Sequence, residues 1–235
     1  MQKLTLKHYA GAGFPAVAIA TSDEDRAISN VVSSFPDREV LRIASIGGLM
    51  NAKNGTPLDK QAQYPAAFAR AQQVKTVLCV LDYQHSVKNA AMYRLLRDSL
   101  PAIKAIKSFV VLIAPSWRLP AEIEHDVPVI QDPLPSREEL EKALEICTSS
   151  TDTKLTVSER DALLDAGSGF TLAEFENSAA LAYAASTSDG YDCAIVTDQK
   201  IKLVRQSGLA EIMQPASADE LGGLGELTRA IDYEI

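Results

Sequence analysis

Two continuous apolar runs constrain the fold of this chain more than any other feature. Residues 76–81 read TVLCVL and residues 109–114 read FVVLIA, without polar residues at alternate positions. Such runs are typical of strands that are buried on both faces of a parallel sheet. The sequence predicts further, shorter strands at residues 16–21, 40–44 and 127–130.

Helical stretches separate the predicted strands. Helices are predicted at residues 23–32, with Ser22 as the N-cap, at 66–73 and at 87–99, whereas the Gly-, Asn- and Pro-rich segment 47–57 is predicted as a loop. Strands that alternate with helices indicate βαβ units, and right-handed crossovers place the helices on both faces of a parallel sheet. The predicted fold class is therefore α/β.

The pattern changes after Pro135 from alternating elements to helices alone. Three pairs match the capping-box pattern, in which a Ser or Thr precedes a Glu by three residues and opens a helix. A fourth helix is predicted over residues 194–206, with Gly208 as its C-cap, and segment 148–153 (TSSTDT) is the best candidate for a linker. The three capping-box pairs are Ser136 with Glu139, Thr156 with Glu159, and Thr171 with Glu174.

Charge and composition exclude several classes of protein. The net charge of -8 argues against a general nucleic-acid binder, and Lys200, Lys202 and Arg205 are interpreted as a solvated helix face. We find neither a signal peptide nor an apolar stretch near the ~20 residues of a membrane span. Three scattered cysteines offer no metal spacing and suit a reducing compartment, so we expect a cytoplasmic protein without nucleic-acid or membrane partners.

A phosphate-binding loop is missing from the place where an α/β nucleotide binder would carry it. The motif G-x-x-x-x-G-K-[ST] cradles phosphates with backbone amides and should follow the first strand. Here residues 21–26 read TSDEDR, which has no glycine and is acidic, so it would repel a triphosphate. We therefore expect that this chain binds no nucleotide and is not an enzyme by itself.

Asp82 is the one residue of the predicted sheet edge with obvious chemistry. It closes the strand VLCVL, which is the outline of a Walker B strand, and His85 follows three residues later as a possible acid/base partner. A strand end or helix cap is the simpler explanation of Asp82, and a surface position at a helix start is the simpler explanation of His85. Trp117, the only tryptophan, either packs against the sheet or serves as a contact residue. We assign no catalytic, cofactor-binding or metal-binding residue.

Several segments, in order, resemble the N-terminal half of the AAA ATPases first recorded as a conserved chloroplast reading frame and also found in bacteria. The last of them, LGGL, is similar to the motif that opens an AAA ATPase module. The segments are 19–27 (IATSDEDRA), 80–83 (VLDY), 94–98 (RLLRD), 111–115 (VLIAP), 119–123 (LPAEI), 132–140 (DPLPSREEL), 169–177 (GFTLAEFEN), 199–200 (QK) with 207–211 (SGLAE), and 221–224 (LGGL).

This resemblance implies a RecA/AAA-like parallel sheet followed by a small helical, lid-like subdomain. The implied domains are a degenerate P-loop/AAA-like α/β domain over residues 1–148, the helical subdomain over 149–212, and a linker toward an ATPase module over 213–235. In the family the Walker motifs lie beyond this point, so no active-site residue is carried over. ATP and Mg²⁺ are then expected in the parent protein, which is expected to be an ATP hydrolase, and not in this chain.

The function that this resemblance implies is a non-catalytic N-terminal domain of a AAA+ ATPase that acts in assembly, regulation or client-protein engagement. Its partners would be the downstream ATPase module, other subunits or a client protein, with a homo-oligomer as one form. Two alternatives stay open. The chain could be a free-standing interaction protein of viral or mobile-element type that binds an ATPase, or a small α/β hydrolase that uses Asp82 at the sheet edge formed by Thr21, Ser45, Asp82 and Pro115.

Overall fold

The computed structural model describes residues 4–151, 154–186 and 190–207. Contacts divide the chain into two compact units, one made of residues 1–136 with 171–173 and the other of residues 137–170 with 174–235. The first unit contains the sheet and the second is helical. Among the described residues, no helix is both long and apolar enough to cross a membrane.

Among the described residues, seven strands form one mixed sheet in the order β4-β3-β2-β5-β6-β1-β7. Every pairing among β2, β5, β6, β1 and β7 is parallel, whereas β3 pairs antiparallel with both β2 and β4. The predicted parallel sheet is thus present, with an antiparallel extension at one edge. The strands are β1 (Ala16–Ala20), β2 (Glu39–Ile43), β3 (Leu49–Asn51), β4 (Pro57–Asp59), β5 (Thr76–Leu81), β6 (Phe109–Ala114) and β7 (Val129–Gln131).

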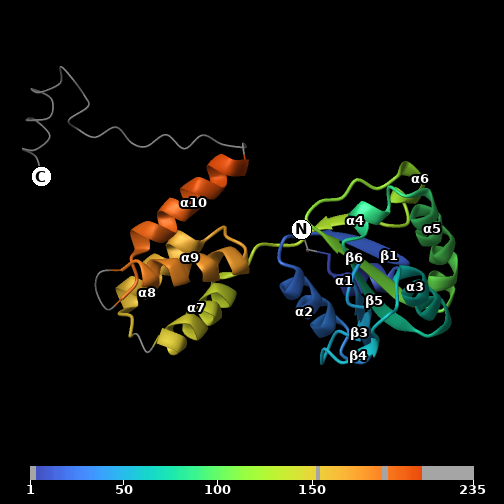
Figure 1. Ribbon diagram of the computed structural model, residues 1–235, viewed down its shortest axis with the longest axis horizontal. Coiled ribbons are helices and arrows are strands. Elements are labelled where there is room, and N and C mark those ends of the chain that lie inside the picture. The colour runs from blue at the N-terminus through green and yellow to red at the C-terminus, as the bar shows by residue number, and fades with distance from the viewer. Residues whose placement is uncertain (1–3, 152–153, 187–189, 208–235) are drawn as a thin grey trace, which may run out of the picture. The chain divides into compact units, whose positions relative to one another are not determined.

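Helices cover both faces of the sheet, as the continuous apolar strands require (Figure 1). Every residue of β1, β5 and β6 is buried. One face packs against α1 (Leu6–Gly11) and α2 (Glu24–Ser34). The other face packs against α3 (Tyr64–Gln73), α4 (Tyr83–Ser86), α5 (Ala90–Ala105) and α6 (Ala121–Glu124). Burying one aliphatic side chain completely contributes about 1.5–3 kcal/mol, so the apolar contacts on the two faces supply most of the unit's stability.

The segment predicted as a loop contains strand β3 and the turn of a β-hairpin, so that prediction was wrong for residues 49–51. β3 pairs with β4, which begins at the last residue of the segment, and Gly48 approaches the backbone at the end of β4 closely. A Cβ atom on Gly48 would lie 2.2 Å from the carbonyl oxygen of Asp59. The backbone φ of Gly48, +76°, also favours glycine at this position. The glycines that indicated a loop are therefore what lets this short hairpin close.

Two helix starts also differ from the predictions. The helix predicted at 87–99 begins three residues later, as α5 at Ala90, and continues to Ala105. The side chain of Asn89 caps it by accepting hydrogen bonds from the amides of Ala91 and Met92. Asp23, and not Ser22, is the N-cap residue of α2, without a side-chain hydrogen bond to that helix. Both helix starts were predicted at the wrong residue because several residues that can cap a helix lie close together in the sequence.

The second unit consists of four helices in the described residues. The predicted capping box at Thr156 is confirmed, because the Thr156 amide donates to Glu159 Oε2 at 2.8 Å and the Glu159 amide donates to Thr156 Oγ1 at 3.3 Å. Arg160 forms ion pairs with Glu141 and Glu145 of the preceding helix. The helices are α7 (Arg137–Thr151), α8 (Val157–Gly167), α9 (Leu172–Ala184) and α10 (Cys193–Ser207).

The two units meet in the sequence between Ser136 and Arg137, which is earlier than the expected domain boundary at residue 148. α7 continues to Thr151, so most of the expected linker 148–153 is helical. The expected boundaries stay predictions for separately folding domains. Gly208, the motif at 221–224 and the expected linker 213–235 lie outside the described residues.

Packing in the second unit predicts that Gly167→Ala destabilises it. A Cβ atom on Gly167 would lie 2.3 Å from the buried ring of Phe175, so the overpacked ring must move at a cost of about 2 kcal/mol. Helix propensity alone predicts the opposite sign, because alanine is favoured over glycine in helices by about 1 kcal/mol. The midpoint of thermal unfolding followed by circular dichroism measures the effect. Gly11→Ala, at a helical site with open space around it, is the control, and an unchanged midpoint for Gly167→Ala would contradict the packing.

Candidate functional site

The topology places the candidate site at the carboxyl ends of β1 and β6. The chain leaves β1 through α2 toward β2 on one side, and leaves β6 through α6 toward β7 on the other side. α2 packs on one face of the sheet, whereas Ile123 of α6 packs on the opposite face. In open α/β sheets a ligand crevice forms where the connections diverge in this way. We call this place the β1/β6 crevice.

The connection from β1 to α2 is too short for a phosphate loop. β1 ends at Ala20 and α2 begins at Glu24, so only Thr21, Ser22 and Asp23 connect them. A phosphate loop needs the backbone of a longer, glycine-containing connection, whose amides surround the phosphate groups. The first turn of α2 also carries the exposed acids Glu24 and Asp25, which offset the partial positive charge of the helix N-terminus.

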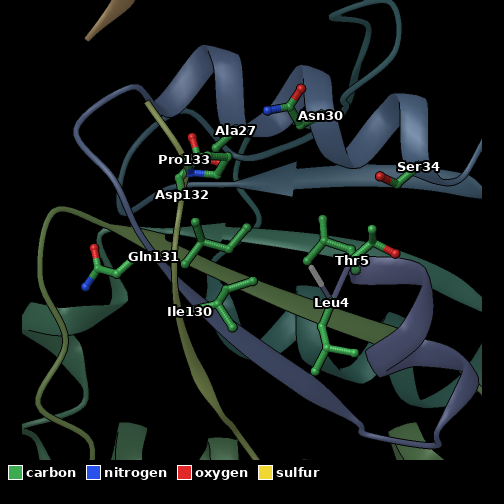
Figure 2. A pocket seen from close by; sticks show the side chains of 11 residues that line it. Leu4, Thr5, Ala27, Asn30, Ser34, Ile130, Gln131, Asp132 and Pro133 are labelled. Carbon is green, nitrogen blue, oxygen red and sulfur yellow. The ribbon is translucent and has the colours of Figure 1, made fainter. Parts of the chain in front are cut away.

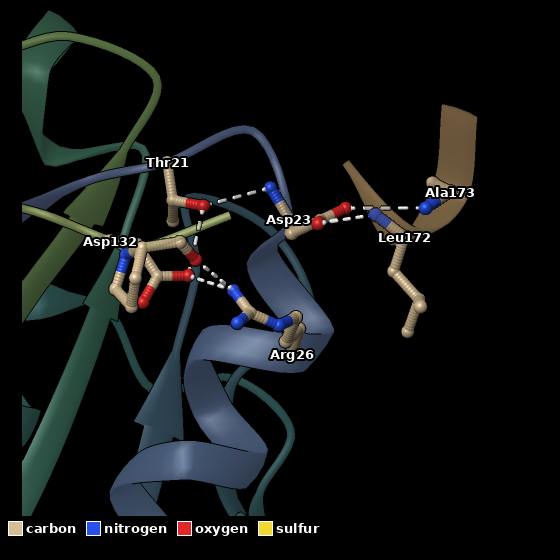
Figure 3. A network of polar contacts seen from close by, with 7 residues as sticks. Thr21, Asp23, Arg26, Asp132, Leu172 and Ala173 are labelled. Carbon is tan, nitrogen blue, oxygen red and sulfur yellow. Dashed lines mark hydrogen bonds and ion pairs between the residues drawn. The ribbon is translucent and has the colours of Figure 1, made fainter. Parts of the chain in front are cut away.

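An internal ion pair fills the space beside this short connection (Figure 3). Nη1 of Arg26 lies 2.7 Å from Oδ2 of Asp132, and only 9% and 10% of the two side chains are exposed. The same nitrogen donates to the carbonyl oxygen of Pro133 at 2.7 Å. Arg26 is therefore directed toward the chain's own acid and carbonyl group after β7, and not outward to a phosphate.

Thr21 adds a second link to the same network. Its hydroxyl donates to Oδ2 of Asp132 at 3.4 Å and accepts a hydrogen bond from the amide of Asp23 at 3.1 Å (Figure 3). That amide stands at the start of α2, where phosphate-binding proteins direct amides at their ligand. In this chain a threonine side chain already satisfies it.

Trp117 closes the crevice from the side of β6. Its indole Nε1 donates to the carbonyl oxygen of Ile19 in β1 at 2.8 Å, and its ring packs against the core face that holds α3 and α5. The sequence left open whether Trp117 packs against the sheet or serves as a contact residue. Its contacts in the structure support packing. The crevice thus has a three-residue connection in place of a glycine-containing loop, and Arg26 and the Asp23 amide are bonded within the chain, so these residues do not fit a nucleotide triphosphate with Mg²⁺.

Asp82 stands at the carboxyl end of β5 in a strained conformation. Its φ of 59° and ψ of 12° lie in the left-handed region, which non-glycine residues rarely adopt. His85 donates a backbone hydrogen bond to the Asp82 carbonyl group at 3.3 Å, but within the described residues no side-chain bond joins the two. The possible acid/base pair is therefore not assembled in this structure.

Asp82 influences two neighbours through its charge. Partial burial, with the carboxylates of Asp82 and Asp25, raises the pKa of Glu24 above its usual range, and Arg42 opposes this more weakly. Burial, again with the charge of Asp82, raises the pKa of Tyr64 to about 12. The hydroxyl of Tyr64 donates to the carbonyl oxygen of Leu81 at 2.7 Å, directly before Asp82.

The four residues that the sequence placed at one edge of the sheet do follow the ends of neighbouring strands. Thr21, Ser45, Asp82 and Pro115 each lie beyond the carboxyl end of one of the parallel strands β1, β2, β5 and β6. Among the described residues, no group of three or more His, Cys, Asp or Glu side chains is placed to hold a metal ion. In the described residues, this edge of the sheet therefore brings strand ends together without forming a group of metal-ligating side chains.

Comparison with known proteins places the chain in a family. A family model described as "SpoVK-like AAA ATPase, N-terminal domain" matches residues 2–131, which is more than half of the chain. The chain belongs to this family. The expectation of an N-terminal region of an AAA ATPase is thereby confirmed. A search of curated proteins found no match.

Solved structures similar to this AAA-family domain support the fold. A RuvB variant from Thermotoga maritima is 11% identical with a TM-score of 0.50, over 83% of this chain and 64% of the RuvB chain. The AAA domain of FIGL-1, solved in complex with ADP, is 12% identical with a TM-score of 0.53, over 93% of this chain and 77% of that one. At such identities the likeness shows the fold alone. It confirms the predicted AAA-like sheet followed by a helical part, and this chain spans less than two thirds of RuvB.

The sequence did not predict the pairing of Arg26 with Asp132. Both residues stand in segments that resemble the family, yet 106 positions separate them along the chain. A signal was available, because each follows the carboxyl end of a parallel strand and β1 and β7 are neighbours in the sheet. Only the strand order, which the sequence did not provide, brings the two together.

Burial of this ion pair predicts a large cost for Asp132→Ala. The variant leaves the Arg26 guanidinium buried without its carboxylate, which typically costs about 3–5 kcal/mol. Asp98→Ala is the control, because the Arg94–Asp98 pair has side chains that are 64% and 58% exposed and is expected to contribute less than about 1 kcal/mol. Urea unfolding of the first unit, followed by the fluorescence of Trp117, measures both. Equal losses in the two variants would show that the Arg26–Asp132 pair is not desolvated.

The raised pKa of Tyr64 predicts a loss of stability in alkaline solution. The unfolded tyrosine releases its proton near pH 10, whereas the folded one keeps it to about pH 12, so deprotonation stabilises the unfolded state relative to the folded state between these values. The free energy of unfolding should fall across pH 10–12, by up to about 2 kcal/mol from this residue. Tyr64→Phe starts lower, because it loses the bond to Leu81, but falls less steeply. Parallel declines in the wild type and the variant would contradict the assignment.

Proposed function

We propose that this chain is a non-catalytic domain of an AAA ATPase that acts in assembly, regulation or client-protein engagement. The observation that carries the proposal is the β1/β6 crevice, where a three-residue connection replaces the phosphate loop and Arg26 is paired with Asp132. Phosphoryl transfer depends on positioning and charge neutralisation of the phosphates, and this crevice offers neither. The chain keeps the fold of its family without the groups that bind a nucleotide.

ATP and Mg²⁺ then belong to another module of the parent protein. Family membership supports an ATPase as the parent, and the shared fold with the ADP-bound FIGL-1 domain supports nucleotide use in such a module. A domain that has the same fold without the chemistry offers its partners a rigid surface. Those partners are the ATPase module, further subunits or a client protein, and cytoplasmic location is part of this proposal.

Nucleotide titration tests the proposal, and Trp117 is a built-in reporter. It is the only tryptophan of the chain and its indole contacts β1 at the crevice, so a nucleotide that enters should change its fluorescence. We expect no saturable change in fluorescence with MgATP or MgADP at concentrations up to about 1 mM. This limit is chosen because enzymes typically have KM values between about 1 μM and 1 mM for their substrates. Saturable quenching that ADP and ATP share would overturn the proposal. Titration of denatured chain controls for absorption by the nucleotide.

A hydrolase that uses Asp82 stays as a second candidate because of the strained backbone at that residue. Non-glycine residues in the left-handed region cost about 1–3 kcal/mol and cluster at functional sites. Asp82→Asn is the suitable variant, because asparagine tolerates this conformation and only the charge is lost. We expect wild type and variant to give the same background turnover on a panel of carboxylic and phosphoric esters. Turnover by the wild type alone would favour the hydrolase.

A further inference from the structure

β7 is an edge strand of the sheet, and no described strand pairs with its outer side. The backbone groups of successive residues in a strand point alternately to its two sides. The carbonyl oxygen of Pro128 accepts a hydrogen bond from β1 at 2.9 Å, and the amide of Asp132 donates one to β1 at 3.2 Å. The N–H and C=O groups of Val129 and Gln131, at the alternate positions, therefore point outward from the sheet.

The edge strand at the other end of the sheet, β4, is better protected against pairing. It begins with Pro57, and its register with β3 is irregular between Leu49 and Met50. Proline and irregular pairing are two of the devices that keep edge strands from recruiting another chain. In β7 the neighbouring Pro128 faces β1, so its missing N–H does not change the outer side. β7 is therefore the more open of the two edges.

Exposed apolar side chains surround the open edge. Val129 is 46% exposed, Leu134 is 56% exposed and Leu4 is 63% exposed. Single apolar residues are ordinary on a protein surface, whereas several at one place indicate a binding surface. Leu4, and Pro133 next to Leu134, also line a pocket beside β7. We call it the α2/β7 pocket.

The α2/β7 pocket suits one large apolar side chain. It lies between α2 and β7 (Figure 2), and its volume of about 280 Å³ is slightly below the 300–1,000 Å³ that is usual for small-molecule sites. The charge of Asp132 in its lining is already neutralised by Arg26. The apolar lining consists of Leu4, Leu6, Ile19, Ala27, Ile130 and Pro133.

A strand added to β7 would direct a side chain toward this pocket. Neighbouring strands lie about 4.8 Å apart, and residues opposite each other project from the same face of the sheet. Ile130 packs on the face that α2 covers, so the residue opposite it would project beside the α2/β7 pocket. The residues before and after it would project from the other face, next to the exposed side chains of Val129 and Gln131.

The charge on that other face favours basic neighbours. α6 packs there, and its Glu122 and Glu124 are exposed and form no ion pair within the described part of the chain. Asp126 is not counted, because it lines the same depression as Lys104. Residues 119–136, which surround β7, include no lysine or arginine. Basic side chains of a partner would therefore be attracted to this side of the edge.

We propose that the outer edge of β7 binds an extended peptide segment of a client protein, in which one large apolar residue has basic residues on both sides. The segment would bond to the backbone of Val129 and Gln131, as in recognition by strand addition. Its backbone would supply affinity, and the pocket and the carboxylates would select its sequence. The inference rests on the proposed function, because it names what client engagement by this domain recognises.

Three synthetic peptides test the proposal on the full wild-type chain. The probe is fluorescein-labelled KTKIKTK, which in extended form directs its isoleucine to one face and all its lysines to the other. KTKDKTK keeps the positive charge and loses the apolar residue, so it controls for general attraction to an acidic protein, and ETEIETE reverses the charge. Fluorescence anisotropy measures binding. We expect saturable binding of KTKIKTK below about 1 mM chain, and at least about tenfold weaker binding of the other two.

Two variants of the chain test the edge and the pocket separately. Gln131→Pro removes an outward N–H without touching the pairing with β1, so it should weaken binding of KTKIKTK by about tenfold. Gln131→Thr keeps the N–H and should bind like the wild type. Asn30→Phe fills the pocket from α2 and should bind KTKIKTK and KTKDKTK about equally. Circular dichroism establishes that each variant is folded.

Several outcomes would overturn the proposal. They are a wild type without saturable binding, equal affinity of the wild type for KTKIKTK and KTKDKTK, and a Gln131→Pro variant that binds like the wild type. The first two need no variant, so they decide the matter even if Gln131→Pro does not fold. Sedimentation velocity without peptide covers the remaining case. A wild type that associates with itself and loses this association in Gln131→Pro would have a second copy at the edge instead of a client.

The outcome is separable from that of the proposed function. A chain that binds MgATP at the crevice and also binds KTKIKTK at β7 would overturn the non-catalytic assignment and leave this inference intact. A chain that binds neither nucleotide nor peptide would overturn this inference alone.

Discussion

The burial of a parallel sheet on both faces is the constraint on which the rest of this structure depends. β5 and β6 are apolar along their whole length, so neither face can be left to water. The chain therefore has to place helices on both faces, with α2 on one and α5 on the other. The strand order of the covered sheet then places the crevice between the ends of β1 and β6.

The crevice is closed by interactions that each have an ordinary structural explanation. A buried arginine needs a carboxylate, a helix start needs acceptors for its amides, and a partly buried indole forms a hydrogen bond where an acceptor is within reach. Asp132, Thr21 and the carbonyl group of Ile19 meet these needs. All three groups lie in or beside the carboxyl end of β1, which in an α/β nucleotide binder is followed by the phosphate loop.

The fold class was predictable from the sequence, because continuous apolar strands and capping boxes are local signals. Thr156 with Glu159 is an example, in which a three-residue spacing already contains the geometry. Features that depend on distant residues were missed. The β3–β4 hairpin looks like a loop until the backbone of Asp59 is placed against Gly48, and Arg26 looks like a surface residue until β7 is placed beside β1. We assigned no site residue from the sequence because it has no phosphate loop after the first strand. No local pattern indicated the ion pair between Arg26 and Asp132.

The length of the connection between β1 and α2 has a consequence for how such a domain could change over time. Replacing side chains cannot turn Thr21, Ser22 and Asp23 into a phosphate cradle, because the missing element is backbone. Recovery would need inserted codons at one place, and the insertion would have to leave the crossover to β2 undisturbed. Point substitutions are far more frequent events than insertions of a set length. Under the function proposed here, point substitutions alone would therefore not give this crevice a nucleotide site.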